Sequence, residues 1–328
     1  MSGLLSWARL SFRLQRLEIL ILATAVALAA GVMLWAAFEL AGLVAAYPAC
    51  DWYDATGDCR APASRFVRAY GVAELILGAM WPAAFGLGLV LGVPVVAREV
   101  DHGTAQLAWT IGRSRVRWLV GRVAFVVVVG VVLLSVLAVV TEILGAAMRF
   151  DIDTSKDFWL HGNRGPLIVG HGVLALGAGV LVGALLGRQL PALLLGAFLV
   201  GALYAASAVG FPRWYATEAV VASQNEWLGG PLWIESGIEL TSGERVTWGE
   251  VYGNGVLAVE MYQAEDGVFY ASQADADAGR DPIGRDYALI IPGERYTQIV
   301  WRETGVFTAV GALLVGAATF VTARRRPV

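Results

Sequence analysis

The sequence predicts an all-α polytopic membrane protein with six transmembrane helices and an α+β insertion between the fifth and the sixth. Three observations lead to this fold class. Of the 328 residues, 57% are hydrophobic and only 16% are charged, whereas a soluble domain carries about 25% charged residues. Six apolar runs approach or exceed the roughly 20 residues that cross a bilayer. One long segment before the last run is polar and acidic, which indicates a domain outside the membrane.

The first 17 residues alternate Leu, Trp and Phe with Arg at helical spacing. This pattern predicts a helix at residues 1–17 that lies in the cytoplasmic interface; a cytoplasmic extension of the first span is the alternative. The predicted spans cover residues 18–44, 70–96, 118–148, 166–187, 190–211 and 304–323. Residues 18–211 therefore hold the first five spans, and residues 304–328 hold the sixth span and a basic cytoplasmic tail.

The distribution of Lys and Arg between the short loops predicts the side on which each loop lies. Twelve arginines gather on one side and six Lys or Arg residues on the other, so the first side is predicted to be cytoplasmic. Both termini are then inside the cell, as an even number of spans requires. Cys50 and Cys59 lie in the first outer loop, where an oxidising environment permits a disulfide. Two free thiols are the alternative.

Residues 212–303 form the predicted extracytoplasmic acidic domain. They include fifteen Asp or Glu and six Arg, a net charge of −9. Their aromatic and Gly content, and the run LWIESGIELTSGERVTW at 232–248, predict at least one β-hairpin. A solvated cap is favoured over a substrate-binding domain. The stretch DADAGRD at 275–281 lacks the residue frame of a calcium loop, so no metal site is predicted there.

Three carboxylates, Glu39, Glu74 and Glu142, lie inside or at the edge of predicted spans, in the outer half of the membrane. An ionisable residue within a span is a candidate functional site. Together they would line an outward cavity for a cationic or amphipathic cargo. The alternative is that each is close enough to the surface to be hydrated.

Small residues recur at every fourth position of the fourth span. They are Ala175, Gly179, Gly183 and Gly187. They form a flat ridge against which another helix can pack closely. That helix belongs either to the same chain or to a second copy.

Several catalytic and cofactor motifs are absent from the sequence. There is no Gly-x-x-x-x-Gly-Lys-Ser/Thr stretch, so the chain cannot bind ATP phosphates through a P-loop. His-Glu-x-x-His and Gly-x-Ser-x-Gly are also absent, and the three histidines are too scattered to form a metal cluster by spacing. We therefore expect no enzyme activity, no metal and no cofactor in this chain, and no nucleic-acid partner.

The predicted cytoplasmic loop at residues 97–117 is rich in arginine and contains two helix-breaking glycines. Gly103 is followed by Thr104, a good N-cap residue, so residues 104–111 (TAQLAWTI) are predicted to form a short helix with an apolar side. Gly112 ends this helix, and the arginines after it lead into the third span. The alternative is an interfacial anchor whose arginines bind anionic lipid.

The loop carries the stretch AREVDHGTAQLAWT, followed by SRVRWL. It resembles the first cytoplasmic loop of ABC-2 type transporter permeases and is closest to the bacterial, high-GC branch of that family. The matching residues are Glu99, Gly103, Thr104, Leu107, Trp109, Ser114, Arg115 and Trp118. A second match is the stretch PGERYTQIVWRETG at 292–305, just before the last span. Its fitting residues are Pro292, Arg295, Tyr296 and Glu303.

The chain also departs from the family pattern. Gly112 stands where many members have Pro, and Ala105 and Gln106 stand where this branch commonly has His-Arg. The exit turn and any partner contact made by residues 105 and 106 therefore differ from those of the family.

The resemblance implies the permease subunit of an ABC exporter in a bacterial plasma membrane. Such a subunit pairs with a second copy of itself, as a homodimer, or with a related permease. The pair binds ABC ATPase subunits, which hold the ATP and Mg²⁺. The matching loop residues from Glu99 to Arg115 would dock on the ATPase, and the cargo would be a small amphipathic molecule such as a drug, an antibiotic or a lipid. The alternative is an ABC-2-like signalling or sensor subunit that does not transport.

Overall fold

The structure is a computed structural model that describes residues 2–50, 52, 56–103, 115–222, 230–253, 261–264 and 267–324; for residues 2–14 and 115 it describes the backbone alone. The chain forms two compact units. The helical unit comprises Met1–Thr154, Leu160–Ala205 and Gln298–Val328. The β-rich unit comprises Ser155–Trp159 and Ala206–Thr297, and most of it is the insertion between the fifth and sixth spans.

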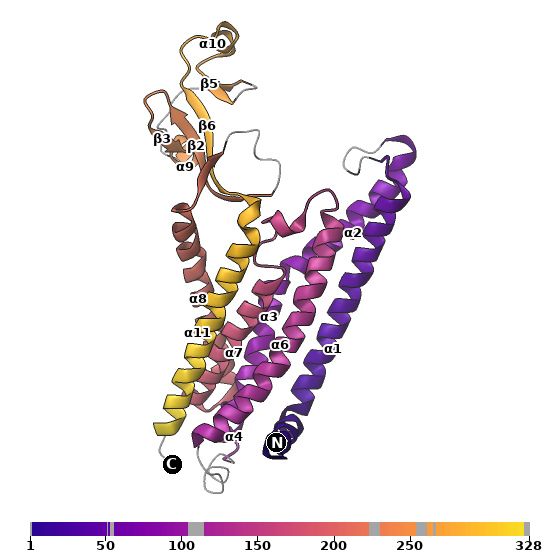
Figure 1. Cartoon of the computed structure of the whole chain (residues 1–328), viewed down its shortest axis with the longest axis vertical. Coiled ribbons are helices and arrows are strands. Elements are labelled where there is room, and N and C mark those ends of the chain that lie inside the picture. The colour runs from indigo at the N-terminus through magenta and orange to yellow at the C-terminus, as the bar shows by residue number, and fades with distance from the viewer. Residues whose placement is uncertain are drawn as a thin grey trace. The chain divides into compact units, whose positions relative to one another are not determined.

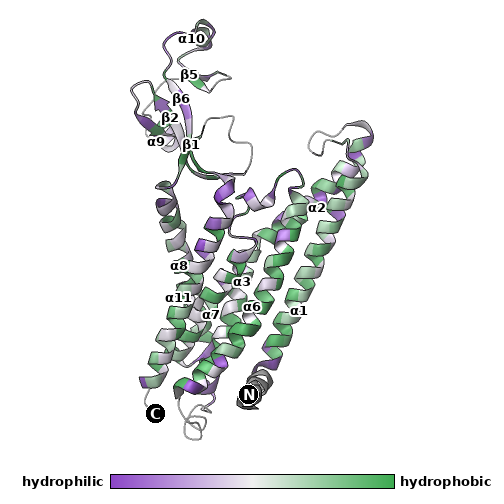
Figure 2. Cartoon of the chain, in the orientation of Figure 1, coloured by the Kyte–Doolittle hydropathy of each residue, from purple (hydrophilic) through white to green (hydrophobic). Residues whose placement is uncertain are grey.

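Six helical segments of the described chain are long and apolar enough to cross a membrane, which confirms the predicted number (Figure 1). They cover Gln15–Ala46, Gly57–Gly92, Val116–Met148, Pro166–Leu186, Gln189–Ala216 and Gly293–Arg324. Hydrophobic residues dominate these segments, and hydrophilic residues gather toward their ends (Figure 2). The chain is therefore a mostly helical, multi-pass membrane protein.

The first span belongs to helix α1, Ser2–Ala46, which is interrupted by a kink. Gln15 has non-helical torsion angles, φ −117° and ψ 17°. The kink therefore separates the arginine-containing residues 2–14 from the apolar run, close to the predicted boundary between the interfacial helix and the first span. Beyond α1, a disulfide joins Cys50 to Cys59, with 5.5 Å between their Cα atoms.

The second span is divided, although the sequence predicts one continuous helix there. It consists of α2 (Arg60–Gly78) and α3 (Met80–Gly92), and α4 (Pro94–Asp101) follows. Pro82 has no N–H to donate to the carbonyl of Gly78, and its ring crowds that carbonyl, so the helix is interrupted at Ala79. Pro94 acts in the same way on the carbonyl of Val90, and α4 begins there.

The remaining spans are formed by long helices: α6 (Arg115–Met148), α7 (Pro166–Leu186), α8 (Gln189–Ala216) and α11 (Tyr296–Arg324). Short 3₁₀ turns occur at Gly57–Cys59, Thr154–Lys156 and Gly293–Arg295. Helix α7 is by far the most buried of the six spans. It forms the centre of the helical unit, packing against α3, α4 and α6.

The small-residue ridge of α7 packs against helices of the same chain. A Cβ atom on Gly179 would lie 3.0 Å from the nitrogen of Val93, and one on Gly183 would lie 2.7 Å from the Val93 oxygen. Ala175 faces Gly88 of α3, where a Cβ atom would lie 2.8 Å from the Ala175 side chain. At this ridge the backbones of α3 and α4 therefore lie close to the backbone of α7. Gly187 has a different role, since it ends α7 with a φ of 65°.

The β-rich unit contains an antiparallel sheet with the strand order β3–β2–β6–β5–β4, and β1 also pairs with β6. The strands are β1 (Val220–Ala222), β2 (Leu232–Leu240), β3 (Arg245–Thr247), β4 (Tyr262–Gln263), β5 (Val268–Tyr270) and β6 (Gly284–Ile291). Strands β2 and β3 form a hairpin within residues 232–248, where one was predicted. Strand β6 is central and pairs with β1, β2 and β5.

Two short helices accompany the sheet, α9 (Trp248–Gly253) and α10 (Gln273–Ala278). Helix α9 begins with a reciprocal cap: the Thr247 N–H donates to Glu250 Oε2 at 2.9 Å, and the Glu250 N–H donates to Thr247 Oγ1 at 3.3 Å. The backbone N–H and the hydroxyl of Thr247 lower the pKa of Glu250. Helix α9 contributes Val251 to a buried cluster with Ile238, Val246 and Phe269.

Candidate functional site

An ion pair joins α4 to the start of α6. The Arg122 Nη2 group donates to Glu99 Oε1 at 2.9 Å, and the two side chains are only 7% and 13% exposed. Arg122 also donates to the carbonyl of Val95 at 3.4 Å, and its guanidinium lies 5.0 Å from the centre of the Trp118 ring. Removing one partner of a buried ion pair costs about 3–5 kcal/mol. Glu99 and Arg122 therefore fix α4 on α6.

Helix α4 is also fixed on α7. Val93 and Ala97 are fully buried in a cluster with Val182 of α7 and Ala192 of α8. Gly183 of α7 lies against Val93 and Ala97. Helix α4 is thus fixed through two sets of buried contacts, one with α6 and one with α7.

Of the residues predicted to couple the chain to an ATPase, the structure describes Glu99, Gly103 and Arg115. Gly103 has a φ of 70°, a left-handed conformation that favours glycine, and it follows the end of α4 at Asp101. Arg115 is the first residue of α6. Thr104, Leu107, Trp109 and Ser114, and with them the predicted helix at 104–111, lie outside the described residues.

A second ion pair lies at the other end of α6. The Arg164 Nη1 group donates to Glu142 Oε2 at 2.7 Å, and Nη2 donates to the carbonyl of Thr154 at 2.9 Å. Gly165 follows with a φ of 65°, and a Cβ atom there would collide with Glu142 Oε1. Both the backbone conformation and the available space therefore require glycine beside this ion pair.

Glu142 lines a cavity of about 520 Å³ between α6, α7 and α11. The lining is otherwise made mainly of apolar side chains: Ala138, Val139, Ile143, Pro166, Val169 and Trp301. Glu142 is the one ionisable residue among the cavity's described lining. The arrangement can hold an apolar molecule next to a single carboxylate.

The three carboxylates predicted for a cargo pathway have different surroundings. Glu39 of α1 accepts a hydrogen bond from Arg65 of α2 at 2.7 Å. Glu74 is exposed on α2. Of the three, only Glu142 lines the cavity between α6, α7 and α11.

The motif before the last span has partners in each unit. Within the β-rich unit, Pro292 precedes the turn Gly293–Arg295, Arg295 donates to Glu218 at 3.1 Å, and Tyr296 packs edge-on against Phe158 with 5.2 Å between ring centres. Within the helical unit, Glu303 Oε2 lies 3.0 Å from His161 Nε2.

His171 of α7 is a further candidate functional residue, which the sequence alone does not indicate. Its side chain is almost fully buried among Phe85, Tyr204 and Phe307, with ring centres 5.0, 5.6 and 4.8 Å away. Its Nδ1 atom has no hydrogen-bond partner among the described residues. A lone histidine in an apolar run is usually a packed core residue, so its sequence context does not distinguish it.

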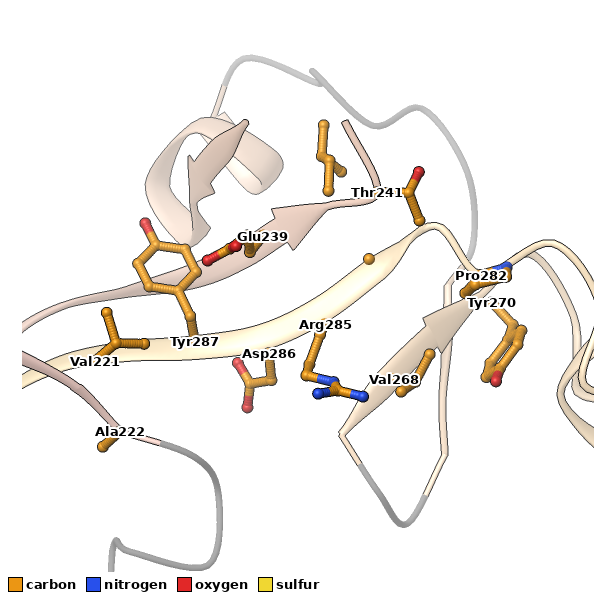
Figure 3. A pocket seen from close by; sticks show the side chains of 12 residues that line it. Val221, Ala222, Glu239, Thr241, Val268, Tyr270, Pro282, Arg285, Asp286 and Tyr287 are labelled. Carbon is orange, nitrogen blue, oxygen red and sulfur yellow. The ribbon is translucent and has the colours of Figure 1, made fainter. Parts of the chain in front are cut away.

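The β-rich unit has its own cavity of about 810 Å³ beside strand β6. Arg285, Asp286 and Tyr287 follow one another along β6 and all line this cavity (Figure 3). Asp286 is 9% exposed, and no cationic side chain of the described chain forms an ion pair with it. Burial raises the pKa of Asp286. Burial and the carboxylate of Glu235, which accepts a hydrogen bond from the Tyr287 hydroxyl at 2.7 Å, raise the pKa of Tyr287.

In the part of the chain that the structure describes, no group of three or more His, Cys, Asp or Glu side chains is arranged to hold a metal ion. The helical unit combines long apolar spans, a buried ion pair that joins α4 to α6, and an apolar cavity at the other end of α6. These features are those of a multi-pass membrane protein.

A family model described as "ABC-2 membrane transporter related" matches residues 23–211, more than half of the chain. The chain therefore belongs to this family of ABC transporter membrane proteins. The match contains both ion pairs of α6. No curated protein and no solved structure matches the chain. Family membership makes the chain a permease component of an ABC transporter and implies an ABC ATPase as its partner.

Proposed function

We propose that this chain is the permease subunit of an ABC exporter, in which a separate ATPase subunit drives the outward transport of a small amphipathic molecule. The observation that carries the proposal is the buried Glu99–Arg122 ion pair, 2.9 Å long, at the base of the loop 97–117. Since the loop is fixed to α4 and continues into α6, a partner that moves the loop also moves these helices.

The contacts of α6 and α7 support transmission of this motion across the membrane. Arg122 and Glu142 are 20 residues apart on α6, which corresponds to about 30 Å. This distance matches the hydrocarbon core of a bilayer. Helix α7 contacts α4 through Gly183 and lines the cavity through Val169. A displacement at the Glu99 end of these helices would therefore alter the cavity at the Glu142 end.

The orientation in this proposal follows from the twelve arginines and six Lys or Arg residues on the two sides. The termini and the loop 97–117 are cytoplasmic, and the disulfide loop and the β-rich unit are outside, in a bacterial plasma membrane. The ATPase supplies the ATP and Mg²⁺ site, because this sequence has no P-loop. Two copies of the permease form the membrane part, and the chain has no enzyme activity of its own.

The test is whether Glu99 couples ATP hydrolysis to transport. The chain is coexpressed with the ATPase that copurifies with it and reconstituted, and rhodamine 6G is used as an amphipathic cationic probe. We expect Glu99→Gln to retain the ATPase but to reduce ATP-driven probe export by about tenfold or more, because Arg122 loses its charged partner on α4 and keeps only the long hydrogen bond to the Val95 carbonyl.

The matched control is Asp101→Asn, which also removes a negative charge from α4 but changes an exposed side chain. It should export the probe as the parent protein does. Normal export by the Glu99 variant, or the same loss in both variants, contradicts the proposed role of the ion pair. Purification of the parent protein without any ATPase contradicts the proposed function itself.

A second candidate function is a membrane sensor that signals without transport. The cavity beside β6 and the buried carboxylate of Asp286 favour it, because they give the β-rich unit a place to bind a ligand of its own. The two functions differ in one measurable respect: a sensor stimulates its partner when a ligand binds but moves no probe across the membrane.

A further inference from the structure

The cavity between α6, α7 and α11 exposes only the acidic member of an ion pair. The side chain of Glu142 is 35% exposed, whereas the side chain of its partner Arg164 is 1% exposed. Arg164 is held behind the carboxylate by a second hydrogen bond, to the Thr154 carbonyl. A molecule in the cavity therefore meets the acid of the pair and not the base.

The cavity is also accessible from the surface of the helical unit. Val139 and Ile143 of α6 are 60% and 45% exposed, and Trp301 of α11 is 60% exposed. These residues lie within candidate membrane spans, so we expect the exposed side chains to face the hydrocarbon of the membrane. An amphipathic molecule dissolved in the membrane can enter from the side without crossing water.

The size and lining of the cavity fit a hydrocarbon chain. The volume of about 520 Å³ lies within the range of about 300–1,000 Å³ typical of small-molecule sites. Val139, Ile143 and Val169 supply apolar walls, and Glu142 supplies a charged hydrogen-bond acceptor at the edge. Because the pair presents the carboxylate of Glu142 and hides the guanidinium of Arg164, an ammonium group would form a charge-assisted hydrogen bond with Glu142, whereas an anionic head group would find no charged donor.

We propose that this cavity is a lateral binding site for single-chain amphiphiles with a primary-amine head group, taken directly from the surrounding membrane leaflet. The hydrocarbon chain lies along Val139, Ile143 and Val169, and the ammonium group lies at Glu142. The proposal rests on the proposed function, since it names the cargo class of the same permease.

The test measures binding by photolabelling, with no ATPase and no ATP present. The full-length protein is placed in phosphatidylcholine nanodiscs, and the probe is hexadecylamine with a diazirine in its chain. The comparison probe is hexadecanoic acid with the same diazirine. After illumination, mass spectrometry identifies the labelled residues. We expect the amine to label cavity residues of α6 and α7 about tenfold more than the acid does, because charge-assisted hydrogen bonds are the strong ones.

Three variants separate the hydrocarbon chain from the head group. Val169→Phe fills the cavity and keeps the ion pair, so it should abolish labelling by both probes. The double variant Glu142→Gln/Arg164→Gln removes both charges and leaves no unpaired buried guanidinium, so it should retain labelling but lose the preference for the amine. Glu244→Gln, at an exposed position between β2 and β3, is the matched control and should keep both labelling and preference.

Two outcomes would overturn the proposal. One is equal labelling of the cavity by the amine and the acid in the parent protein. The other is labelling that persists in the Val169→Phe variant. Either result leaves the coupling experiment on Glu99 unaffected, and failure of that experiment would leave the labelling result intact, so the two proposals fail separately.

Discussion

Buried charged residues in this protein differ in whether an oppositely charged partner lies beside them. Arg122 and Arg164 are both buried, and each holds a glutamate that the sequence alone had singled out. Asp286 is the opposite case. It is buried on the central strand β6 without a cationic partner in the described chain, and burial raises its pKa.

Asp286→Asn is predicted to stabilise the β-rich unit at neutral pH. The folded unit binds the proton of Asp286 more tightly than the unfolded chain does, where the pKa is about 3.9. The stabilisation by this proton is therefore present at low pH and is lost as the pH rises above the unfolded value. We expect the variant to gain about 1 kcal/mol at pH 7, and much less at pH 4.

Hydrogen exchange of the β6 amides in the full chain measures this effect. Exchange at pH 7 should be about fivefold slower in the variant than in the parent protein, with little difference at pH 4. Asp277→Asn, on an exposed position of α10, is the control and should change nothing. If the variant slows exchange equally at both pH values, ionisation of Asp286 does not destabilise the folded β-rich unit, and the prediction is wrong.

At the scale of elements, the packing of α7 explains why the helical unit needs so many glycines. Gly179 and Gly183 contact the backbone around Val93, and Gly177 contacts the backbone of Gly311 in α11. Small residues at these positions let the helices approach closely and gain van der Waals contact. The ridge is therefore an interface inside one chain.

Gly183→Leu is predicted to destabilise the helical unit. A Cβ atom at this position would lie 2.7 Å from the Val93 oxygen, so α4 must move away from α7 at a cost of about 1–3 kcal/mol. Thermal unfolding of the purified protein in detergent should show a lower midpoint. Gly201→Leu, where no atom lies within 4 Å of the added Cβ, should leave the midpoint unchanged or raise it; a similar fall in both variants would refute the packing argument.

The sequence predicted the number and approximate limits of the spans because hydropathy depends on local composition. It did not predict the break at Ala79, since Pro82 lies within an apolar run that reads as one continuous span. It selected Glu99 and Glu142 but missed Arg122 and Arg164 as their partners. Those pairs join residues 23 and 22 positions apart, and such pairings depend on how helices pack rather than on local pattern.

At the scale of the whole molecule, the arrangement of spans across the membrane connects the remaining proposals. The disulfide between Cys50 and Cys59 lies in a loop that the arginine distribution predicts to be outside. The β-rich unit follows α8 and precedes α11 in the chain. Four spans, the second to the fifth, separate it from the disulfide loop, so both are predicted to lie on the same side of the membrane.

A membrane-impermeant maleimide applied to intact cells tests this orientation. We expect labelling of Cys50 and Cys59 only after treatment with a reductant, because the disulfide blocks both thiols and the loop faces outward. Lysis of the cells should not increase the labelling. If the thiols react only after lysis, the predicted orientation is inverted, and the loop 97–117 faces away from the ATPase.

The glycine contacts of α7 have a consequence for motion. Where two helices meet through glycines, few side chains interlock and no rotamers must change when one helix shifts along the other. Small sliding displacements of packed helices are an established way for proteins to change conformation. We therefore expect α7 to act as a sliding surface for α3 and α4, so that the permease adjusts by shear within a closely packed bundle rather than by opening at a hinge.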